Sequence, residues 1–171
     1  MSDVMIDIET LGRAPGCVVL SVGAVLFDRG GFTSEFEANI DIRSSMSHGL
    51  TIEADTLLWW MARGLKELPN VVSLSEASMR FCDWFRAVQP SRVWANSPSF
   101  DCEIWGYAME RVEHCRPWNF RQTRDMRTAR ELLPFNVEGD KINFGEAHTA
   151  LADAKWQAEY LRRAGLFSAQ N

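Results

Sequence analysis

The sequence contains no long apolar run and no basic leader. Its longest apolar stretch, Cys17 to Phe27, is interrupted by Ser21 and is far too short to cross a bilayer. The first residues include acids in place of the basic residues of a secretory signal. We therefore predict a cytoplasmic location and no membrane partner.

Cysteine pairs and low-complexity tracts are also missing. The four cysteines form no C-x-x-C motif and show no metal-ligand spacing, which favours reduced thiols. No linker or repeat divides the 171 residues, of which 46% are hydrophobic and 24% are charged. This length and composition are typical of one soluble globular domain, which we predict over residues 1–171.

An excess of positive charge is absent as well. The net charge of −5 argues against a polyanionic partner. However, six arginines lie between Arg111 and Arg130. They form either a rim that contacts phosphate, with Arg124 as a candidate, or a solvated face paired with neighbouring acids. The sequence leaves both interpretations open.

The sequence does carry acidic residues in three separate segments: Asp7 with Glu9, then Asp101, then Asp153. Four carboxylates from distant segments supply the negative charge that holds two divalent cations close together. His148 precedes Asp153 and adds a side chain that can transfer a proton. We therefore predict a site for two Mg²⁺ or Mn²⁺ ions with these four acids as ligands.

Asp7 and Glu9 are predicted to end the first strand. Val4, Ile6 and Ile8 alternate with the two acids, so the apolar and acidic side chains point to opposite faces. Acidic residues are unfavourable in strands, and a pair of them at the end of an apolar strand favours a functional site. The alternative is a solvated strand end.

Asp101 and Asp153 each have a structural alternative. Asp101 follows a predicted turn at Asn96–Ser99 and can serve as a first-turn acid of a helix. Asp153 is either exposed or turned toward the strand that carries Asp7, where the small Ala150 allows close approach. It lies off the predicted buried stripe of the last helix, which consists of Ala147, Leu151, Ala154, Ala158 and Leu161.

Two adjacent tryptophans, Trp59 and Trp60, are candidates for stacking on a base, a contact worth about 1–3 kcal/mol. The alternative is core packing on their predicted helix. Because adjacent helix positions point about 100° apart, we expect one ring in the core and the other available to a ligand. Phe100 is predicted to be a core residue that seats Asp101.

The remaining pattern predicts an α/β fold with a mixed sheet flanked by helices. A three-stranded antiparallel meander with glycine-containing turns precedes alternating helices and parallel strands. Ser73 and Glu76 form a predicted capping box. The predicted strands are Val4–Ile8, Cys17–Phe27, Phe32–Ile40 and Arg92–Ala95, and the predicted helices are Ala54–Arg63, Leu74–Val88, Phe100–Val112, Met126–Leu132 and Thr149–Arg163.

Taken together, the motifs resemble those of the DnaQ-like 3′-5′ exonucleases of the DEDD superfamily, in the DEDDh subgroup whose last motif contains histidine. Asp7–Thr10 is similar to the first family motif, Asn96–Asp101 to the second and His148–Asp153 to the third. Thr56–Trp60 and Arg124–Arg130 resemble segments of the small stand-alone exonucleases of phages and bacteria. The resemblance spans nearly the whole chain.

This resemblance implies a ribonuclease-H-like fold and hydrolysis of single-stranded DNA or RNA from the 3′ end to nucleoside monophosphates. It implies that Asp7 bridges both metal ions and that Glu9 and Asp153 complete the first metal site. It further implies that Asp101 acts through water at the second site and that His148 is the general base.

The resemblance also implies substrate contacts at Thr10 and Leu11, which would lie against the terminal nucleotide, and at Asn96 of the second motif. The chain departs from the family at Ala95, where a histidine is common, and at Leu11, where proofreading members carry threonine. The alternatives are a catalytically inactive module that binds nucleic-acid ends and a hydrolase of a small phosphorylated molecule. A homodimer is a further possibility, and the sequence names no other protein partner.

Overall fold

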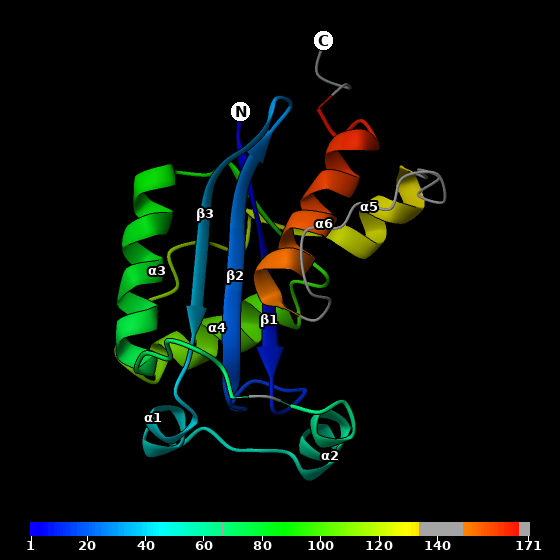
Figure 1. The fold of residues 1–171 in the computed structure, drawn as a ribbon. Coiled ribbons are helices and arrows are strands. Elements are labelled where there is room, and N and C mark those ends of the chain that lie inside the picture. Colours follow the sequence, from blue (N-terminus) through cyan, green and yellow to red (C-terminus); the bar gives the residue numbers. More distant parts are fainter. Residues whose placement is uncertain (66, 134–148, 168–171) are drawn as a thin grey trace.

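A five-stranded mixed sheet with the strand order β3-β2-β1-β4-β5 organises the chain (Figure 1). The computed structural model describes residues 1–65, 67–133 and 149–167. β1, β2 and β3 form an antiparallel meander, whereas β4 is parallel to β1 and β5 is parallel to β4. The strands are β1 (Asp3–Thr10), β2 (Val19–Asp28), β3 (Gly31–Asn39), β4 (Arg92–Ala95) and β5 (Thr123–Asp125). The predicted meander and mixed sheet are therefore confirmed.

Helices cover both faces of the sheet. α3 and α4 pack on one face and α5 and α6 on the other, while α1 and α2 lie near the end of the sheet toward which β1 runs (Figure 1). The helices are α1 (Ile42–Ser47), α2 (Ala54–Ala62), α3 (Leu74–Val88), α4 (Asp101–Glu110), α5 (Met126–Leu132) and α6 (Ala150–Arg163). None of the described helices is long and apolar enough to span a membrane.

The alternation predicted for the first strand is present in β1. Val4, Ile6 and Ile8 belong to the core between the sheet and α3 and α4. Met5 belongs to the second core, beneath α5 and α6. Because side chains alternate along a strand, Asp7 and Glu9 share the face of Met5, which is the face that α6 covers.

α6 packs directly against β2 at Gly23. A Cβ atom at this position would overlap the backbone of Ala150 and Leu151, so only glycine permits the helix to come this close. Ala150, Ala154 and Ala158 are buried along this contact. The close approach places the first turn of α6 beside the end of β1.

One part of the predicted α6 stripe is wrong. Leu151 is only partly buried, and Ala150 occupies the contact position in its place. The physical reason is that Gly23 accepts the helix backbone itself, so a small residue suits the contact better than a leucine. Ala147, the first residue of the predicted stripe, lies outside the described residues.

Candidate active site

Three carboxylates meet where β1 ends and α6 begins. Asp7, Glu9 and Asp153 each offer an oxygen, and these oxygens lie within 4.8 Å of one another. β1 supplies two of them because Asp7 and Glu9 are two residues apart, and the first turn of α6 supplies the third. Hard oxygen ligands of this kind suit Mg²⁺ and Mn²⁺.

Asp101 faces this group from the start of α4. Its side chain is 3% exposed, and Asp101 Oδ2 accepts a hydrogen bond from the Asn96 backbone N–H at 3.1 Å. The Ile8 backbone N–H also bonds this carboxylate. β1 and β4 pair only as far as Met5 and Trp94. The Ile8 N–H lies beyond this last pair, so β4 does not use it and it can bond Asp101. The predicted convergence of three distant segments is therefore present in the structure.

The site strongly disfavours four ionised acids in the absence of cations. The pKa of Glu9 is raised to about 8, mainly by burial and in smaller part by the charges of Asp153 and Asp101. Burial raises the pKa of Asp101 to about 7 despite the hydrogen bonds from Asn96 and Ile8. The pKa of Asp7 lies well above its ordinary value because of burial and the Asp101 charge. Bound cations would reverse these effects, as expected of a metal site.

Gln157 is a site residue that the sequence analysis missed. Gln157 Nε2 donates a hydrogen bond of 2.7 Å to Asp7 Oδ1, and the side chain is only 4% exposed. Its Oε1 atom has no hydrogen-bond partner within the described part of the chain. The available signal was spacing, because Gln157 follows Asp153 by four residues and so lies on the same helix face.

Arg127 is the arginine of the 111–130 stretch whose charge acts on the site. Its Nε and Nη2 atoms donate to the side-chain and backbone oxygens of Asn96, each at 3.3 Å. Its charge lowers the pKa of Asp101, against the larger effect of burial. By contrast, Arg116 is paired with Glu103 and Glu110.

Arg124 is held by backbone contacts. Its Nη1 donates to the backbone oxygens of Arg121 and Thr123. A contact between Arg124 and substrate stays a prediction.

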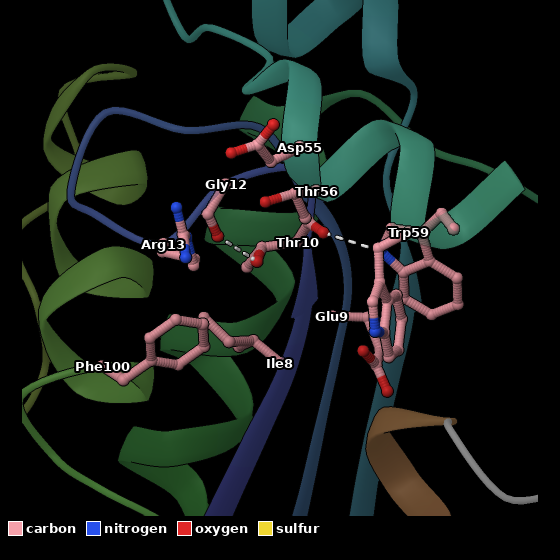
Figure 2. A pocket seen from close by; sticks show the side chains of 10 residues that line it. Ile8, Glu9, Thr10, Gly12, Arg13, Asp55, Thr56, Trp59 and Phe100 are labelled. Carbon is pink, nitrogen blue, oxygen red and sulfur yellow. Dashed lines mark hydrogen bonds between the residues drawn. The ribbon is translucent and has the colours of Figure 1, made fainter. Parts of the chain in front are cut away.

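A cavity of about 430 Å³ adjoins Glu9 and is called here the terminal cavity (Figure 2). In Figure 2 Asp55, Thr56 and Trp59 reach it from α2, while Arg13 and Phe100 lie across from Trp59. The terminal cavity is lined by Ile8, Glu9, Thr10, Gly12, Arg13, Asp55, Thr56, Trp59, Trp60 and Phe100. It is large enough to hold a small ligand beside the acids.

The two tryptophans of α2 differ in their surroundings, as predicted. Trp60 packs against the core, and its Nε1 donates a hydrogen bond of 2.9 Å to the Thr10 oxygen. Trp59 is 40% exposed and lies edge-on to Trp60, with the Arg63 guanidinium 3.8 Å from its ring centre. Trp60 is therefore the more enclosed ring and Trp59 the more exposed one, although both line the terminal cavity.

The Leu11 side chain does not occupy the position that the family resemblance implied. Its side chain is 1% exposed and lies in the core, so the implied side-chain contact with a nucleotide does not fit this structure. Its backbone N–H and oxygen bond Val18 and Glu53, which anchors the turn after β1. Thr10 does line the terminal cavity, where its hydroxyl donates to the Gly12 oxygen.

Phe100 also lies where it was predicted. It packs partly buried against the core directly before Asp101, and it lines the terminal cavity as well. His148, the predicted general base, lies outside the described residues.

A mixed sheet flanked by helices, with acids at the end of its central strand and at the starts of two helices, is a ribonuclease-H-like architecture. The chain belongs to the family of Rv2179c-like 3′-5′ exoribonuclease domains, whose model matches residues 2–164. The prediction that the chain belongs to a family of 3′-5′ exonuclease domains is thereby confirmed.

Solved structures of exonuclease I share the fold. The zinc-bound E. coli exonuclease I complex with single-stranded DNA superposes with a TM-score of 0.70 and 12% identity, covering 97% of this chain and 41% of that one. E. coli exonuclease I in complex with a dT13 oligonucleotide superposes with a TM-score of 0.69 and 13% identity, covering 96% of this chain and 41% of that one. A product-bound exonuclease I superposes with a TM-score of 0.64 and 12% identity, covering 95% of this chain and 43% of that one. The chain thus spans about two-fifths of their length. No curated protein matches the sequence.

Proposed function

We propose that this chain hydrolyses single-stranded nucleic acid from its 3′ end and releases nucleoside monophosphates. The observation that carries the proposal is the cluster of Asp7, Glu9 and Asp153, whose oxygens lie within 4.8 Å of one another, with Asp101 facing it. The family favours RNA as the substrate, while the structural neighbours are exonucleases in complex with single-stranded DNA.

The acids fit two divalent cations in both chemistry and charge. Asp7, Glu9 and Asp153 would hold one ion, and Asp101 would contribute to a second next to Asp7. When bound, two such ions stabilise the attacking and leaving oxygens of an in-line displacement. Raised pKa values of Glu9 and Asp101 support this assignment, because crowded and buried carboxylates stay ionised only beside cations.

The chain's own residues would position the substrate and manage its protons. The terminal cavity would receive the last nucleoside, with Trp59 offering a ring on which a base can stack. His148 would accept the proton of the attacking water. An end-binding module without activity is the second candidate, but such a module has no physical need for four converging carboxylates.

The test uses matched single-stranded RNA and DNA oligonucleotides, each labelled at the 5′ end and offered with a free or a blocked 3′ end. We expect stepwise shortening of free ends, release of nucleoside monophosphates, and a requirement for added Mg²⁺ or Mn²⁺. Undiminished activity in excess EDTA would contradict the metal assignment. Tight end binding without any cleavage would favour the inactive module.

A further inference from the structure

A second cavity also adjoins Glu9. This sheet-side cavity has a volume of about 450 Å³, and Glu9 and Trp60 line both it and the terminal cavity. The rest of its lining comes from β2, β3, the segment after α2 and Thr149, whereas the terminal cavity is lined from the end of β1, α2 and Phe100. In Figure 2 the Glu9 side chain extends away from Arg13 and Phe100, toward the first turn of α6.

The floor of the sheet-side cavity is a row of side chains across three strands. Glu9 is paired with Ser21, and Ser21 is paired with Asn39. Directly opposed residues of antiparallel strands present their side chains on the same face, so this row leads from a metal ligand to the edge strand β3. α6 begins at Ala150 and packs against β2 two residues further along, at Gly23.

An exonuclease that cleaves the last phosphodiester bond must hold a nucleoside on each side of the scissile phosphate. We propose that the terminal cavity binds the 3′-terminal nucleoside and that the sheet-side cavity binds the nucleoside before it, whose 3′ oxygen leaves. The proposal rests on the exonuclease function proposed above. Each cavity adjoins Glu9, and the rest of each lining differs except for Trp60, so a phosphate held at the acids would lie next to two separate cavities.

The position of each cavity decides which nucleoside it takes. The nucleoside before the last is still joined to the rest of the strand, so its cavity must leave a way out. The sheet-side cavity reaches β3, an edge strand, and exposed residues such as Glu37 and Arg63 line it. Glu37 offers an acceptor for hydroxyl or base donors, and Arg63 offers a cation to the next phosphate.

Two substrates separate the cavities experimentally. A single-stranded oligonucleotide requires both, whereas the p-nitrophenyl ester of a nucleoside 5′-monophosphate replaces the preceding nucleoside with nitrophenol and requires only the terminal cavity. The test variants are Glu37→Ala, which removes a contact, and Glu37→Trp, which fills the sheet-side cavity. Thr33→Trp is the matched control, because Thr33 is an exposed position of β3 that does not line the cavity. Thr56→Trp fills the terminal cavity.

We expect Glu37→Ala to lower kcat/KM on the oligonucleotide about tenfold, which corresponds to one charged hydrogen bond, and Glu37→Trp to lower it further. Both variants should cleave the ester as fast as the Thr33→Trp control. Thr56→Trp should impair both substrates.

Equal losses on both substrates in the Glu37 variants, no loss on either substrate, or a Thr56→Trp defect confined to the oligonucleotide would overturn the assignment. A wild-type protein that cleaves neither substrate would instead refute the proposed exonuclease function.

Discussion

Asp7 is the residue on which the other site groups act. It receives a hydrogen bond from Gln157, and the charges of Asp101, Glu9 and Asp153 all raise its pKa. In the metal-free protein this crowding is unfavourable, since like charges at short range repel one another. The proposed metal binding and the stability of the metal-free protein therefore place opposite demands on the same four carboxylates.

Removing one of these charges should abolish activity and stabilise the metal-free fold. Asp7→Asn and Asp153→Asn are expected to have no measurable turnover on oligonucleotides but a higher melting temperature in EDTA. Asp83→Asn is the control, because Asp83 is an exposed acid of α3 paired only with Arg86 among the described ion pairs. Near-wild-type turnover in either site variant would refute the ligand assignment.

Gln157 should tune the metal site without being a ligand. Gln157→Leu keeps the approximate size of the side chain but removes the donor to Asp7, so we expect the Mn²⁺ concentration for half-maximal activity to rise about 10–100-fold. Gln157→Asn, a shorter amide, should recover part of this loss. Lys155→Leu on the same helix, which loses an ion pair with Glu35, should leave the Mn²⁺ requirement as it is. Equal Mn²⁺ requirements in Gln157→Leu and wild type would exclude the positioning role.

His148 should act on the proton and leave the metal ions in place. His148→Ala is expected to bind Mn²⁺ as the wild type does but to lose about 10²–10⁴ in turnover, the usual contribution of a general base. The wild-type rate should rise with pH as the imidazole loses its proton, and the variant should lack this rise. Calorimetric Mn²⁺ titration and a pH–rate profile distinguish the two effects. Loss of Mn²⁺ binding in the variant would identify His148 as a ligand instead.

At the scale of elements, sequence periodicity predicted the helices and strands in which buried apolar residues and exposed polar residues recur at regular spacing. Leu74–Val88, Met126–Leu132 and Arg92–Ala95 were predicted with the boundaries that the structure shows. The Ser73 cap is also present, since its side chain accepts from the Glu76 N–H. The meander was predictable because apolar residues and glycine turns alternate along it.

Two elements were not predictable from local pattern. β5, Thr123–Asp125, has three residues and carries two charges, so its strand character comes from pairing with β4. α1, Ile42–Ser47, has six residues with only two apolar ones, Ile42 and Met46, which is too short a pattern to predict a helix, and it begins at its Asp41 cap. Gln157 was missed for a related reason, because its contact with Asp7 joins residues far apart in the sequence.

The contact of α6 with β2 sets the position of Asp153. Gly23→Ala would force the helix backbone away from the sheet, and such overpacking typically costs about 1–3 kcal/mol. We expect a lower melting temperature together with weaker Mn²⁺ binding, since Asp153 would move away from Asp7 and Glu9. Gly30→Ala in the β2–β3 turn is the control, because the nearest atom to its new Cβ would be a side-chain oxygen of Asp28. Unaltered Mn²⁺ binding in Gly23→Ala would show that this contact does not set the site.

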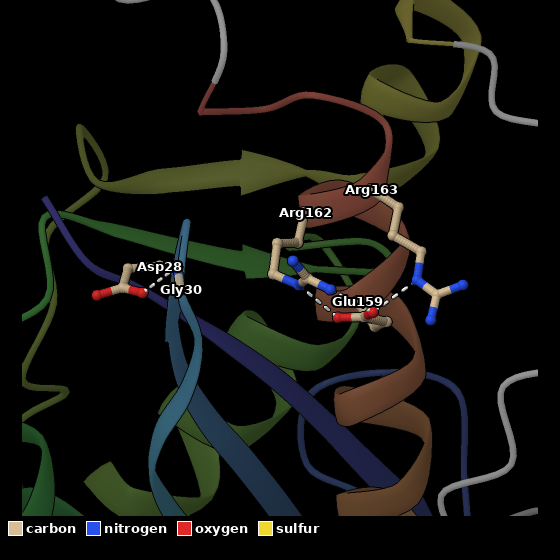
Figure 3. A network of polar contacts seen from close by, with 5 residues as sticks. All are labelled: Asp28, Gly30, Glu159, Arg162 and Arg163. Atoms are coloured by element: carbon tan, nitrogen blue, oxygen red, sulfur yellow. Dashed lines mark hydrogen bonds and ion pairs between the residues drawn. The ribbon is translucent and has the colours of Figure 1, made fainter.

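At the scale of the whole molecule, opposite electrostatics lie near the two ends of α6. Its first turn carries Asp153 in the crowded acidic site. Toward its last turn the buried Glu159 accepts hydrogen bonds of 2.6 Å from Arg162 and Arg163 (Figure 3). Figure 3 also shows Asp28 and Gly30 of the β2–β3 turn, where the Gly30 N–H donates to Asp28. The Arg162 hydrogen bond, with that from Arg163, lowers the pKa of Glu159.

These two regions should give the metal-free protein a stability maximum in mild acid. The pKa of Glu9 is raised to about 8 and that of Asp101 to about 7. At a pH between the ordinary pKa and the raised pKa of each acid, the folded state binds more protons than the unfolded state. Stability therefore falls as pH rises from about 4.5 to about 8. Glu159 has a lowered pKa, so its contribution is present above its ordinary value and is lost as pH falls below it.

Thermal unfolding across this pH range, in EDTA and in Mn²⁺, tests the prediction. Mn²⁺ should remove the fall in melting temperature between about pH 4.5 and about pH 8, because bound cations favour the ionised acids. In EDTA, Glu9→Gln should reduce this fall in melting temperature at rising pH. Glu159→Gln should reduce only the loss of melting temperature at a pH below the ordinary pKa of a glutamate. A melting temperature in EDTA that rises steadily from pH 5 to pH 8 would contradict the crowded-carboxylate description, since no group with a raised carboxyl pKa can produce that slope.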